Sequence, residues 1–324
     1  MGWALSEVQK LDLPLLMKGI VPTIIEESPL LGGVDGGEKR KALTFQTINS
    51  TGQRINRELT LPVSDWYVAG DTITSSETTY TQVTHTLSTV ITQRDINDFM
   101  EQASNGQQPV MKIALQEMTK SLTRKVEQRI IYGDNSTNTK EPSGLHLLLG
   151  TNAASSAQVV YGSADATPDA GTLLKLRQVI DLVKPGRPDM LLMSRQTLRN
   201  ISAYGSALQS PVQFEVSSFG RRVPVFDDIP IAISDYVSNT ENIDSSGLFT
   251  ASTGGTATSI FALKFGDRAF TGYEHGAIQH IPVGVHQSKD AHIHRMRWYV
   301  GFNFKSILAG AAYTGISNAI FTNS

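Results

Sequence analysis

Cysteine is absent from the 324 residues of the chain. A protein without thiols has no disulfide, no cysteine nucleophile and no cysteine-ligated zinc. Long apolar runs are missing too: no stretch approaches the ~18 residues of a transmembrane helix, and residues 1–19 lack the apolar centre of a secretory signal. The sequence therefore predicts a protein without thiol chemistry and without a membrane partner, made in the cytosol of the producing cell.

An excess of charge of either sign is also missing. The 28 lysines and arginines nearly balance the 30 acidic residues, which leaves a net charge of −2. A dedicated nucleic-acid binder would be distinctly basic, so that class is excluded. A content of 40% apolar and 18% charged residues is typical of a folded globular protein and excludes a mainly disordered chain. The length suffices for one large domain or for two to three small ones.

The sequence motifs of the common enzyme classes are missing as well. There is no G-x-S-x-G, no H-E-x-x-H, no Walker motif and no dinucleotide fingerprint. Glu274 and His275 are adjacent and could serve acid–base chemistry, but no nucleophile or orienting residue accompanies them in the sequence. The sequence therefore predicts no enzyme, no catalytic residue and no cofactor.

Histidines are concentrated late in the chain, where five of the seven lie at positions 275, 280, 286, 292 and 294. On a strand, His292 and His294 would share one face and could hold a metal ion. That face continues with Met296, Trp298 and Val300, and an apolar face favours packed and hydrogen-bonded histidines. The sequence therefore predicts no metal site.

The N-terminal segment combines helical spacing with helix breakers. Apolar residues recur at roughly helical intervals between residues 4 and 31, but Pro14, Pro22 and Pro29 interrupt them. A glycine-rich stretch, LLGGVDGGEKRK, follows at residues 30–41. We expect an arm of short helical pieces that a flexible joint connects to the rest of the chain.

Residues 42–62, ALTFQTINSTGQRINRELTLP, have the pattern of a β-hairpin. Folding the stretch about Gly52 places Leu43 opposite Leu61, Phe45 opposite Leu59, and Ile48 opposite Ile55 or Asn56, while Ser50 and Thr51 complete the turn. The tip is polar, and a lone two-stranded ribbon is marginally stable in water. The hairpin is therefore expected to rest on another surface.

The strongest single element lies at residues 109–132. Its apolar residues repeat at helical spacing on one face, and charged residues occupy the other. Pro109 and Gly133 are suited to the two ends. A helix of this length spans ~35 Å and crosses a whole domain. The apolar stripe is formed by Met111, Leu115, Met118, Leu122, Val126 and Ile130.

The second half of the chain alternates between helical and strand patterns, which predicts a compact α/β unit. Ser194 is a candidate N-cap and Gly205 a candidate stop for one of its helices. The expected elements are a helix at 173–183, a buried strand at 189–194, a helix at 194–205, a hairpin of 212–216 with 223–233, and further strands between 259 and 302.

In this order of elements the chain resembles the major capsid proteins of tailed double-stranded-DNA bacteriophages, which have the Hong Kong 97-type fold. Three stretches strengthen the resemblance. GRRVPVFDDIPIAI is similar to the family's G-x-x-x-P-V-x-x-D-x-I-P hairpin, and IFALKFGDRAFTGYEHGAIQ with HRMRWYVGFNFKSILAGAAYTGI is similar to its C-terminal strands. The resemblance implies an α+β fold with an N-terminal arm, an extended E-loop hairpin, a P-domain with a long spine helix, and an A-domain.

The resemblance also implies a division of the chain. We expect the N-terminal arm and glycine joint at 1–41, the E-loop at 42–80, the P-domain at 81–150 with the spine helix at 109–132, the A-domain at 151–258, the P-domain return strands at 259–300, and a C-terminal segment at 301–324 that returns to the A-domain.

The implied function is self-assembly into hexamers and pentamers that form an icosahedral phage head around double-stranded DNA. Implied partners are other copies of the chain, portal, scaffolding and decoration proteins, and packaged DNA in passive contact; the implied location is the virion, after assembly in the bacterial host cytoplasm. The residues expected to contact neighbouring subunits are Phe45, Ile48, Arg54, Ile55, Arg57, Glu58 and Leu59 in the E-loop, and Leu11, Leu15, Leu16, Ile24 and Ile25 in the arm.

Some relatives join an E-loop lysine to an asparagine of a neighbour by an isopeptide bond. This chain has no lysine between Ala42 and Met111, so no such cross-link is expected. Three alternatives remain open: a hairpin that packs on its own domain, an encapsulin-type compartment shell, and an α/β enzyme.

Overall fold

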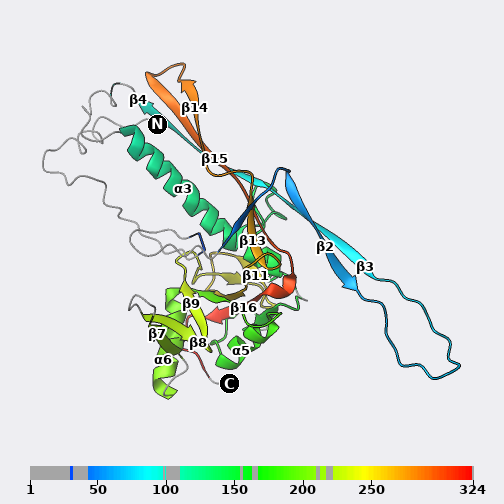
Figure 1. Ribbon diagram of the computed structural model, residues 1–324. Coiled ribbons are helices and arrows are strands. Elements are labelled where there is room, and N and C mark those ends of the chain that lie inside the picture. Colours follow the sequence, from blue (N-terminus) through cyan, green and yellow to red (C-terminus); the bar gives the residue numbers. More distant parts are fainter. Residues whose placement is uncertain are drawn as a thin grey trace.

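The computed structural model describes residues 30–31, 43–97, 99, 110–153, 156–162, 167–208, 212–216 and 222–322. Two sheets organise this part of the chain, and a long helix and a projecting ribbon lie beside the first of them (Figure 1). None of the described helices is long and apolar enough to cross a membrane.

The first sheet has five strands and is built around β15 (Ala291–Phe304). Residues 291–300 of β15 pair with β4 (Ser88–Asn97), and the other edge of β15 pairs with β13 (Phe270–Glu274) and β14 (Gln279–Val285). β1 (Phe45–Thr47) joins β13 in parallel. Apolar and polar residues alternate along β15, as expected for a sheet with one covered face.

Helix α3 (Val110–Tyr132) covers one face of the five-stranded sheet (Figure 1). Met118, Leu122 and Val126 are buried in one cluster with Met296 and Trp298 of β15. The predicted helix is therefore present at nearly the predicted residues. In its first turns Val110 and Ala114 are the buried residues, whereas the predicted Met111 and Leu115 are half-buried.

The second sheet has seven strands in the order β5, β16, β12, β6, β9, β8, β7. Helices α5 (Leu173–Leu182) and α6 (Arg195–Leu208) belong to the same part of the chain, and the α5 residues Leu173, Leu176 and Ile180 are buried. Thr172 caps α5 and Ser194 caps α6 by accepting backbone N–H groups three residues on. The strands are β5 (Val159–Tyr161), β6 (Met190–Met193), β7 (Val212–Val216), β8 (Arg222–Phe226), β9 (Ile229–Ile233), β12 (Ala257–Leu263) and β16 (Gly310–Ser317).

Short elements complete the described chain. They are α4 (Leu145–Leu149), the two-stranded pair β10 (Asn242–Ile243) and β11 (Phe249–Ala251), and the 3-10 turn η1 (Ile307–Ala309). The chain passes from the seven-stranded sheet to the five-stranded sheet after β12 and returns with β16.

A two-stranded ribbon of β2 (Gly52–Thr60) and β3 (Thr79–Thr86) projects from the body, and the chain between the two strands extends further (Figure 1). The predicted hairpin about Gly52 is wrong in its pairing. Gly52 pairs with Thr86 and Ile55 with Val83, so the partner of β2 lies after the predicted hairpin. The alternating apolar residues of β2 predict that it pairs with another strand, but they do not identify that strand. The Thr-rich β3 is as suitable a partner as the predicted residues 43–48.

The first half of the predicted hairpin lies instead in the five-stranded sheet. Phe45 pairs with Gly272, and its ring packs against Trp298 and Phe302 at centroid distances of 5.4 and 6.3 Å. A side chain at position 272 would collide with the Phe45 ring, which would lie about 2.6 Å from the added Cβ. Residues 43–48 are therefore the root of the ribbon and not one of its arms.

Three predicted boundaries also differ from the structure. Helix α6 continues past Gly205 to Leu208. Strand β12, part of the predicted 259–300 return segment, lies in the seven-stranded sheet. Strand β15 continues past residue 300 to Phe304, into the segment that was expected to have left this sheet. Residues 300–304 are all buried, so burial gives no signal for a change of sheet at residue 300.

Candidate inter-subunit surfaces

Hydrogen bonds anchor the base of the ribbon to its own five-stranded sheet. The Arg57 guanidinium donates to the backbone carbonyls of Phe304 and, at 3.0 Å, Lys305. The Asn303 side chain donates to Gln53 at 2.8 Å, and the Tyr273 hydroxyl donates to the Thr86 carbonyl at 3.4 Å. Both strands of the ribbon are therefore fixed at the end near the sheet.

Burial at this base lowers the pKa of two basic groups. It lowers the pKa of Arg57, and burial together with the nearby Arg57 charge lowers the pKa of His85. An arginine stays charged even so, because its ordinary pKa is above 12. His85 is therefore neutral at pH 7. Of these two side chains, only Arg57 carries a charge at the base of the ribbon.

The far part of the ribbon, residues 58–80, is called the distal loop here. Its apolar side chains have no cover from the described part of their own chain: Trp66 is 99% exposed. Its charges are all negative, and no lysine or arginine occurs between Arg57 and Arg94. The distal loop thus joins apolar surface to acidic groups. The exposed apolar residues are Leu59, Leu61, Val63, Trp66, Tyr67, Val68, Ile73 and Tyr80, and the acids are Glu58, Asp65, Asp71 and Glu77.

Local hydrogen bonds give the distal loop some internal order. The Val68 N–H donates to the Asp71 carboxylate at 2.8 Å, and the Asp71 N–H donates to the Val68 carbonyl at 3.0 Å. The Val63 N–H donates to the Ser76 hydroxyl at 2.7 Å, which ties the two sides of the loop together. These bonds leave the apolar side chains exposed to solvent, since every residue from 61 to 78 is exposed except Thr78, which is half-buried.

The predicted E-loop contact residues fall into two groups. Arg54, Glu58 and Leu59 are exposed on the ribbon. The other predicted residues contact their own chain. Phe45 packs on the five-stranded sheet, and the backbone of Ile48 forms hydrogen bonds with the Glu274 carbonyl and the His275 ring. Arg57 donates to the Phe304 and Lys305 carbonyls, and Ile55 is half-buried within the ribbon. The predicted arm contacts at Leu11, Leu15, Leu16, Ile24 and Ile25 lie outside the described residues.

The predicted E-loop at 42–80 encloses the distal loop, but the predicted contact residues end at Leu59. Trp66, Tyr67, Val68 and Ile73 lie beyond the predicted hairpin and are far more exposed than Phe45 or Ile48. A usable signal was present: large apolar residues in a stretch with acids, no bases and no helical or strand period. Such residues have no internal face to occupy and are suited to a partner.

The face of the five-stranded sheet opposite α3 carries a row of arginines, and we call it the arginine face. Arg295 donates to Gln93 on β4 at 2.8 and 3.2 Å, and Arg297 donates to Gln279 on β14 at 3.0 Å. The Arg297 guanidinium also lies 5.4 Å from the centre of the Tyr299 ring. Both arginines are held by neutral amides, and in the described part of the chain neither forms an ion pair.

A groove of about 510 Å³ lies where the arginine face meets the root of the ribbon. Arg297 and Tyr299 contribute to its floor, and His275 is held there by a 2.8 Å hydrogen bond between its Nδ1 and the Ile48 carbonyl. The groove thus offers a cation, an aromatic ring and neutral polar groups. Its other lining residues are Asn49, Ser50, Thr51, Leu87, Thr89 and Gln279.

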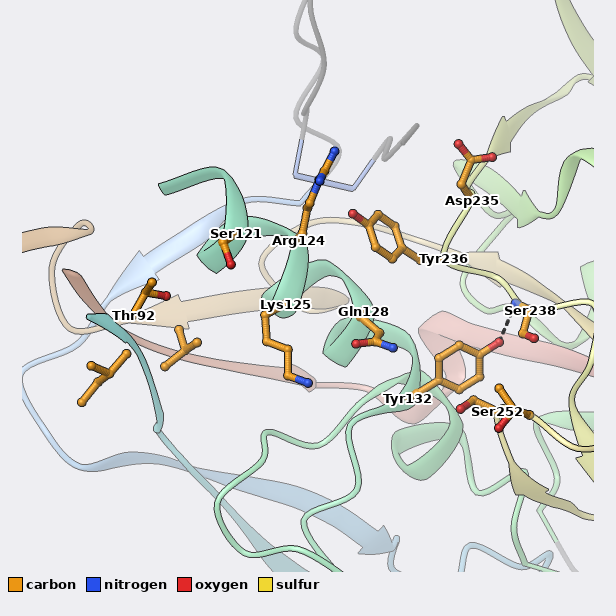
Figure 2. A pocket seen from close by; sticks show the side chains of 13 residues that line it. Thr92, Ser121, Arg124, Lys125, Gln128, Tyr132, Asp235, Tyr236, Ser238 and Ser252 are labelled. Atoms are coloured by element: carbon orange, nitrogen blue, oxygen red, sulfur yellow. Dashed lines mark hydrogen bonds between the residues drawn. The ribbon is translucent and has the colours of Figure 1, made fainter. Parts of the chain in front are cut away.

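A second cleft, of about 670 Å³, lies between α3, β4 and loops that include residues 235–238 and 252–253 (Figure 2). Ser121, Arg124, Lys125 and Gln128 line it from one face of α3, at helical spacing. At its far end the Tyr132 hydroxyl accepts a 2.7 Å hydrogen bond from the Ser238 N–H. The cleft is polar throughout that end.

Two of the late histidines, His280 and His294, form a pair, whereas the pair considered from the sequence was His292 with His294. His294 is buried, and its Nδ1 lies 3.0 Å from Nε2 of His280 on the neighbouring strand. That distance is a hydrogen bond between imidazoles. Within the described ranges, no three metal-ligating side chains come together.

Comparisons with known proteins agree with this architecture. The chain is similar in fold to the holo-SrpI encapsulin complex of Synechococcus elongatus PCC 7942, with 15% identity, a TM-score of 0.68, and coverage of 100% of this chain and 99% of that one. It is likewise similar to the capsid of a native GTA particle (11%, TM-score 0.63, 97% and 99% covered) and to the capsid of Myoviridae phage XM1 (12%, 0.59, 95% and 98%). No curated protein matches the sequence significantly.

The sequence itself matches the model of the phage capsid family over residues 14–213, which is more than half of the chain. The predicted Hong Kong 97-like α+β fold is confirmed by the capsid structures that cover nearly the whole chain. Family and fold together indicate a structural protein that assembles with copies of itself, as opposed to an enzyme. The chain belongs to the phage capsid family and is a shell-forming protein of the Hong Kong 97-like fold.

Proposed function

We propose that this chain is the major shell subunit of a tailed-phage head, in which hexamers and pentamers enclose double-stranded DNA. The observation that carries the proposal is the contrast within the ribbon. Its base is tied to the subunit by Arg57, Gln53 and Thr86, while its distal loop exposes eight large apolar side chains. A neighbouring subunit that covers them would remove apolar surface from water at about 25 cal/mol per Å².

The shell is proposed to be held by noncovalent contacts. The ribbon contains no lysine that could form an isopeptide bond, so stability would come from many modest contacts repeated around each ring of subunits. The N-terminal arm, with Leu11, Leu15, Leu16, Ile24 and Ile25, is proposed to pack on a neighbour. Portal, scaffolding and decoration proteins are the further partners, and assembly is proposed to occur in the host cytoplasm.

The spine helix and its surroundings support a P-domain built on the five-stranded sheet, and the seven-stranded sheet supports an A-domain. We place the A-domain at residues 151–263 and 305–322 and the P-domain at 81–150 and 264–304, with the E-loop at 49–87. Packaged DNA is proposed to meet the inner wall passively, since a net charge of −2 does not favour tight binding of a polyanion.

A second candidate is an encapsulin-type shell around protein cargo. The observation in its favour is the TM-score of 0.68 with an encapsulin complex, over 100% of this chain. Both candidate functions predict the same contacts between subunits, but the shell encloses DNA in the first and protein cargo in the second. Purified particles from the producing cell would contain nuclease-protected DNA in the first case and a copurifying enzyme in the second.

The test of shell formation is sedimentation velocity with negative-stain electron microscopy on the purified chain, across salt and protein concentration. Hollow shells, or rings of five and six subunits, are expected. A chain that stays monomeric under all conditions, including with candidate scaffolding proteins present, would refute the proposal.

A further inference from the structure

The side of α3 that faces away from the five-stranded sheet carries a row of basic residues. Residues at every fourth position from 112 to 128 form a ridge on the side of the helix opposite the buried ridge that begins with Val110 and Ala114. All of its residues are exposed except the half-buried Arg124. With the adjacent ridge, this surface is called the basic stripe here. It consists of Lys112, Gln116, Glu117, Lys120, Ser121, Arg124, Lys125 and Gln128.

The basic stripe has an excess of positive charge in a chain whose net charge is −2. Glu117 is its single acid, and Arg94 of β4 forms a salt bridge with that carboxylate. Within the described ranges, the ammonium groups of Lys112, Lys120 and Lys125 form no hydrogen bond or ion pair. The stripe therefore presents three lysines to solvent whose charge no acid of the described chain neutralises.

The second cleft, at the C-terminal half of the stripe, adds hydrogen-bond donors to these charges (Figure 2). Lys125 and Gln128 line it from α3, and the hydroxyls of Thr92 and Ser252 line it from β4 and from a loop. Ammonium, amide and hydroxyl groups are the donors that bind phosphate oxygens in protein–DNA complexes. Asp235, from the loop of residues 235–238, is the one acid among the described lining residues. The cleft thus favours an anion with several oxygen atoms.

The composition of the stripe favours a nucleic-acid backbone over a protein partner. Protein interfaces depend on apolar and aromatic anchors, but every residue of the stripe is polar, and Met111, Ile113 and Leu115 beside it are half-buried. A DNA backbone instead presents evenly spaced charges. Between Lys112 and Lys125 the helix rises by ~20 Å, and one DNA strand places a phosphate at every ~3.4 Å of its axis. The stripe is therefore long enough to follow about six phosphates of one strand.

We propose that the basic stripe binds phosphate groups of the packaged double-stranded DNA, with Lys112, Lys120 and Lys125 each neutralising one phosphate. This inference rests on the proposed function and names the surface of the subunit that faces the interior of the shell. The contact is independent of base sequence, because it reaches only the backbone. It is also weak, because the remainder of a subunit with a net charge of −2 repels DNA. Weak binding allows the DNA to be packed against the wall and released from it.

The salt dependence of DNA binding tests the proposal on the unassembled full-length chain. Fluorescence anisotropy of a labelled DNA duplex is measured for the parent and for a triple variant, Lys112→Gln, Lys120→Gln and Lys125→Gln, between about 50 and 200 mM salt. Each phosphate contact contributes about 0.9 to the slope of log affinity against log salt. The triple variant should lose about 2.7 of this slope and at least tenfold in affinity at the lowest salt. Glutamine has a helix propensity close to that of lysine, so the fold is preserved.

The matched control makes the same change in net charge at three exposed lysines outside α3, with Lys140→Gln, Lys184→Gln and Lys289→Gln. It should keep the slope of the parent. Equal losses in the two triple variants, or a parent that does not bind the duplex, would overturn the inference and leave shell formation, which sedimentation measures separately, intact. A parent that forms no shells would refute the proposed function, and the assignment to packaged DNA would fail with it.

A competitor distinguishes DNA from an acidic protein. Unlabelled duplex of a different sequence should displace the labelled duplex from the parent, whereas polyglutamate at the same concentration of charge should displace several-fold less. Polyglutamate that competes as well as the duplex would assign the stripe to an acidic protein partner and overturn the inference.

A second measurement uses assembled particles. DNA-filled shells, and the same shells emptied of DNA, are treated with a small amine-acetylating reagent, and the modified lysines are identified by mass spectrometry. Lys112, Lys120 and Lys125 should be acetylated several-fold less in the filled shells, while Lys140 and Lys289 should be modified equally in both. Equal acetylation of the three stripe lysines in filled and empty shells would count against the proposal.

Discussion

The hydroxyl of Tyr132, at the end of α3, donates a 2.5 Å hydrogen bond to the buried carboxylate of Glu241. Burial, and then the charge and hydrogen bond of Glu241, raise the pKa of Tyr132 above its ordinary value, so the phenol is protonated at pH 7 and can donate. Ser259 of β12 donates to the second oxygen of Glu241, also at 2.5 Å. One carboxylate therefore joins the spine helix to the seven-stranded sheet.

Replacing this carboxylate should destabilise the subunit. Glu241→Ala leaves the Tyr132 and Ser259 hydroxyls buried with no acceptor, and His146, 3.4 Å from the carboxylate, loses its neighbour. Each buried donor left unsatisfied costs about 1–3 kcal/mol, so we expect a loss of roughly 3 kcal/mol in the free energy of unfolding. Urea denaturation of the unassembled subunit measures it. Glu77→Ala on the distal loop is the control and should change stability by less than about 0.5 kcal/mol.

Removing the distal loop should separate folding from assembly. Replacing residues 61–78 by a two-glycine turn shortens the ribbon without touching either sheet, because no strand lies between Thr60 and Thr79. The variant should keep the parent's circular dichroism spectrum and thermal midpoint but form no shells in sedimentation velocity. Shells from this variant would contradict a role for the loop in assembly.

Arg57 should act on the base of the ribbon and not on a neighbouring subunit. Arg57→Ala removes the bonds to the Phe304 and Lys305 carbonyls and should cost about 1–2 kcal/mol of local stability. Hydrogen exchange would show it as faster exchange in β2 and β3. Arg54→Ala lies on the same strand with an exposed side chain and serves as the control. Unchanged exchange in Arg57→Ala, with impaired assembly, would instead place this arginine in an inter-subunit contact.

His85 should make the anchoring of the ribbon depend on pH. Its pKa is lowered in the folded chain, first by burial and then by Arg57, from an ordinary value of 6.5. The unfolded chain therefore binds more protons in this range, and stability falls as the pH drops below about 6.5. The free energy of unfolding, measured at pH 7.5 and pH 5.5, should fall less in His85→Gln than in the parent. An identical fall in both would assign the pH dependence to other groups.

Assembled shells should dissociate fully in denaturant. The ribbon and the stretch before α3 contain no lysine, so boiling in detergent should return every chain to the 35.2 kDa position on a gel. A ladder of higher bands that survives reduction would show a covalent link formed elsewhere in the chain, and mass spectrometry of those bands would identify it.

Elements with a long internal period were predictable from sequence. Apolar residues recur at helical spacing along the 23 residues of α3, so both ends of the helix can be predicted closely. The spacing of Leu173, Leu176 and Ile180 predicts α5 in the same way. The hairpin of β7 with β8 and β9 was also predicted correctly, since its strands are neighbours in sequence.

Partners that are distant in sequence were not predictable. Phe45 pairs with Gly272, and the choice between that strand and the nearby 55–61 segment depends on contacts that local alternation does not encode. For the same reason the arginine face was not foreseen. In the sequence Arg295 and Arg297 are two basic residues among many, and only the pairing of β15 with β4 and β14 aligns them beside Gln93 and Gln279.

The path of the chain through the seven-stranded sheet has a consequence for synthesis. Strand β16 lies between β5 and β12 and pairs with both. A nascent chain that has been translated only as far as residue 309 therefore has β5 without its neighbour and an unclosed sheet. The ribbon, by contrast, consists of residues translated long before. The seven-stranded sheet therefore closes around β5 only after β16 has been translated.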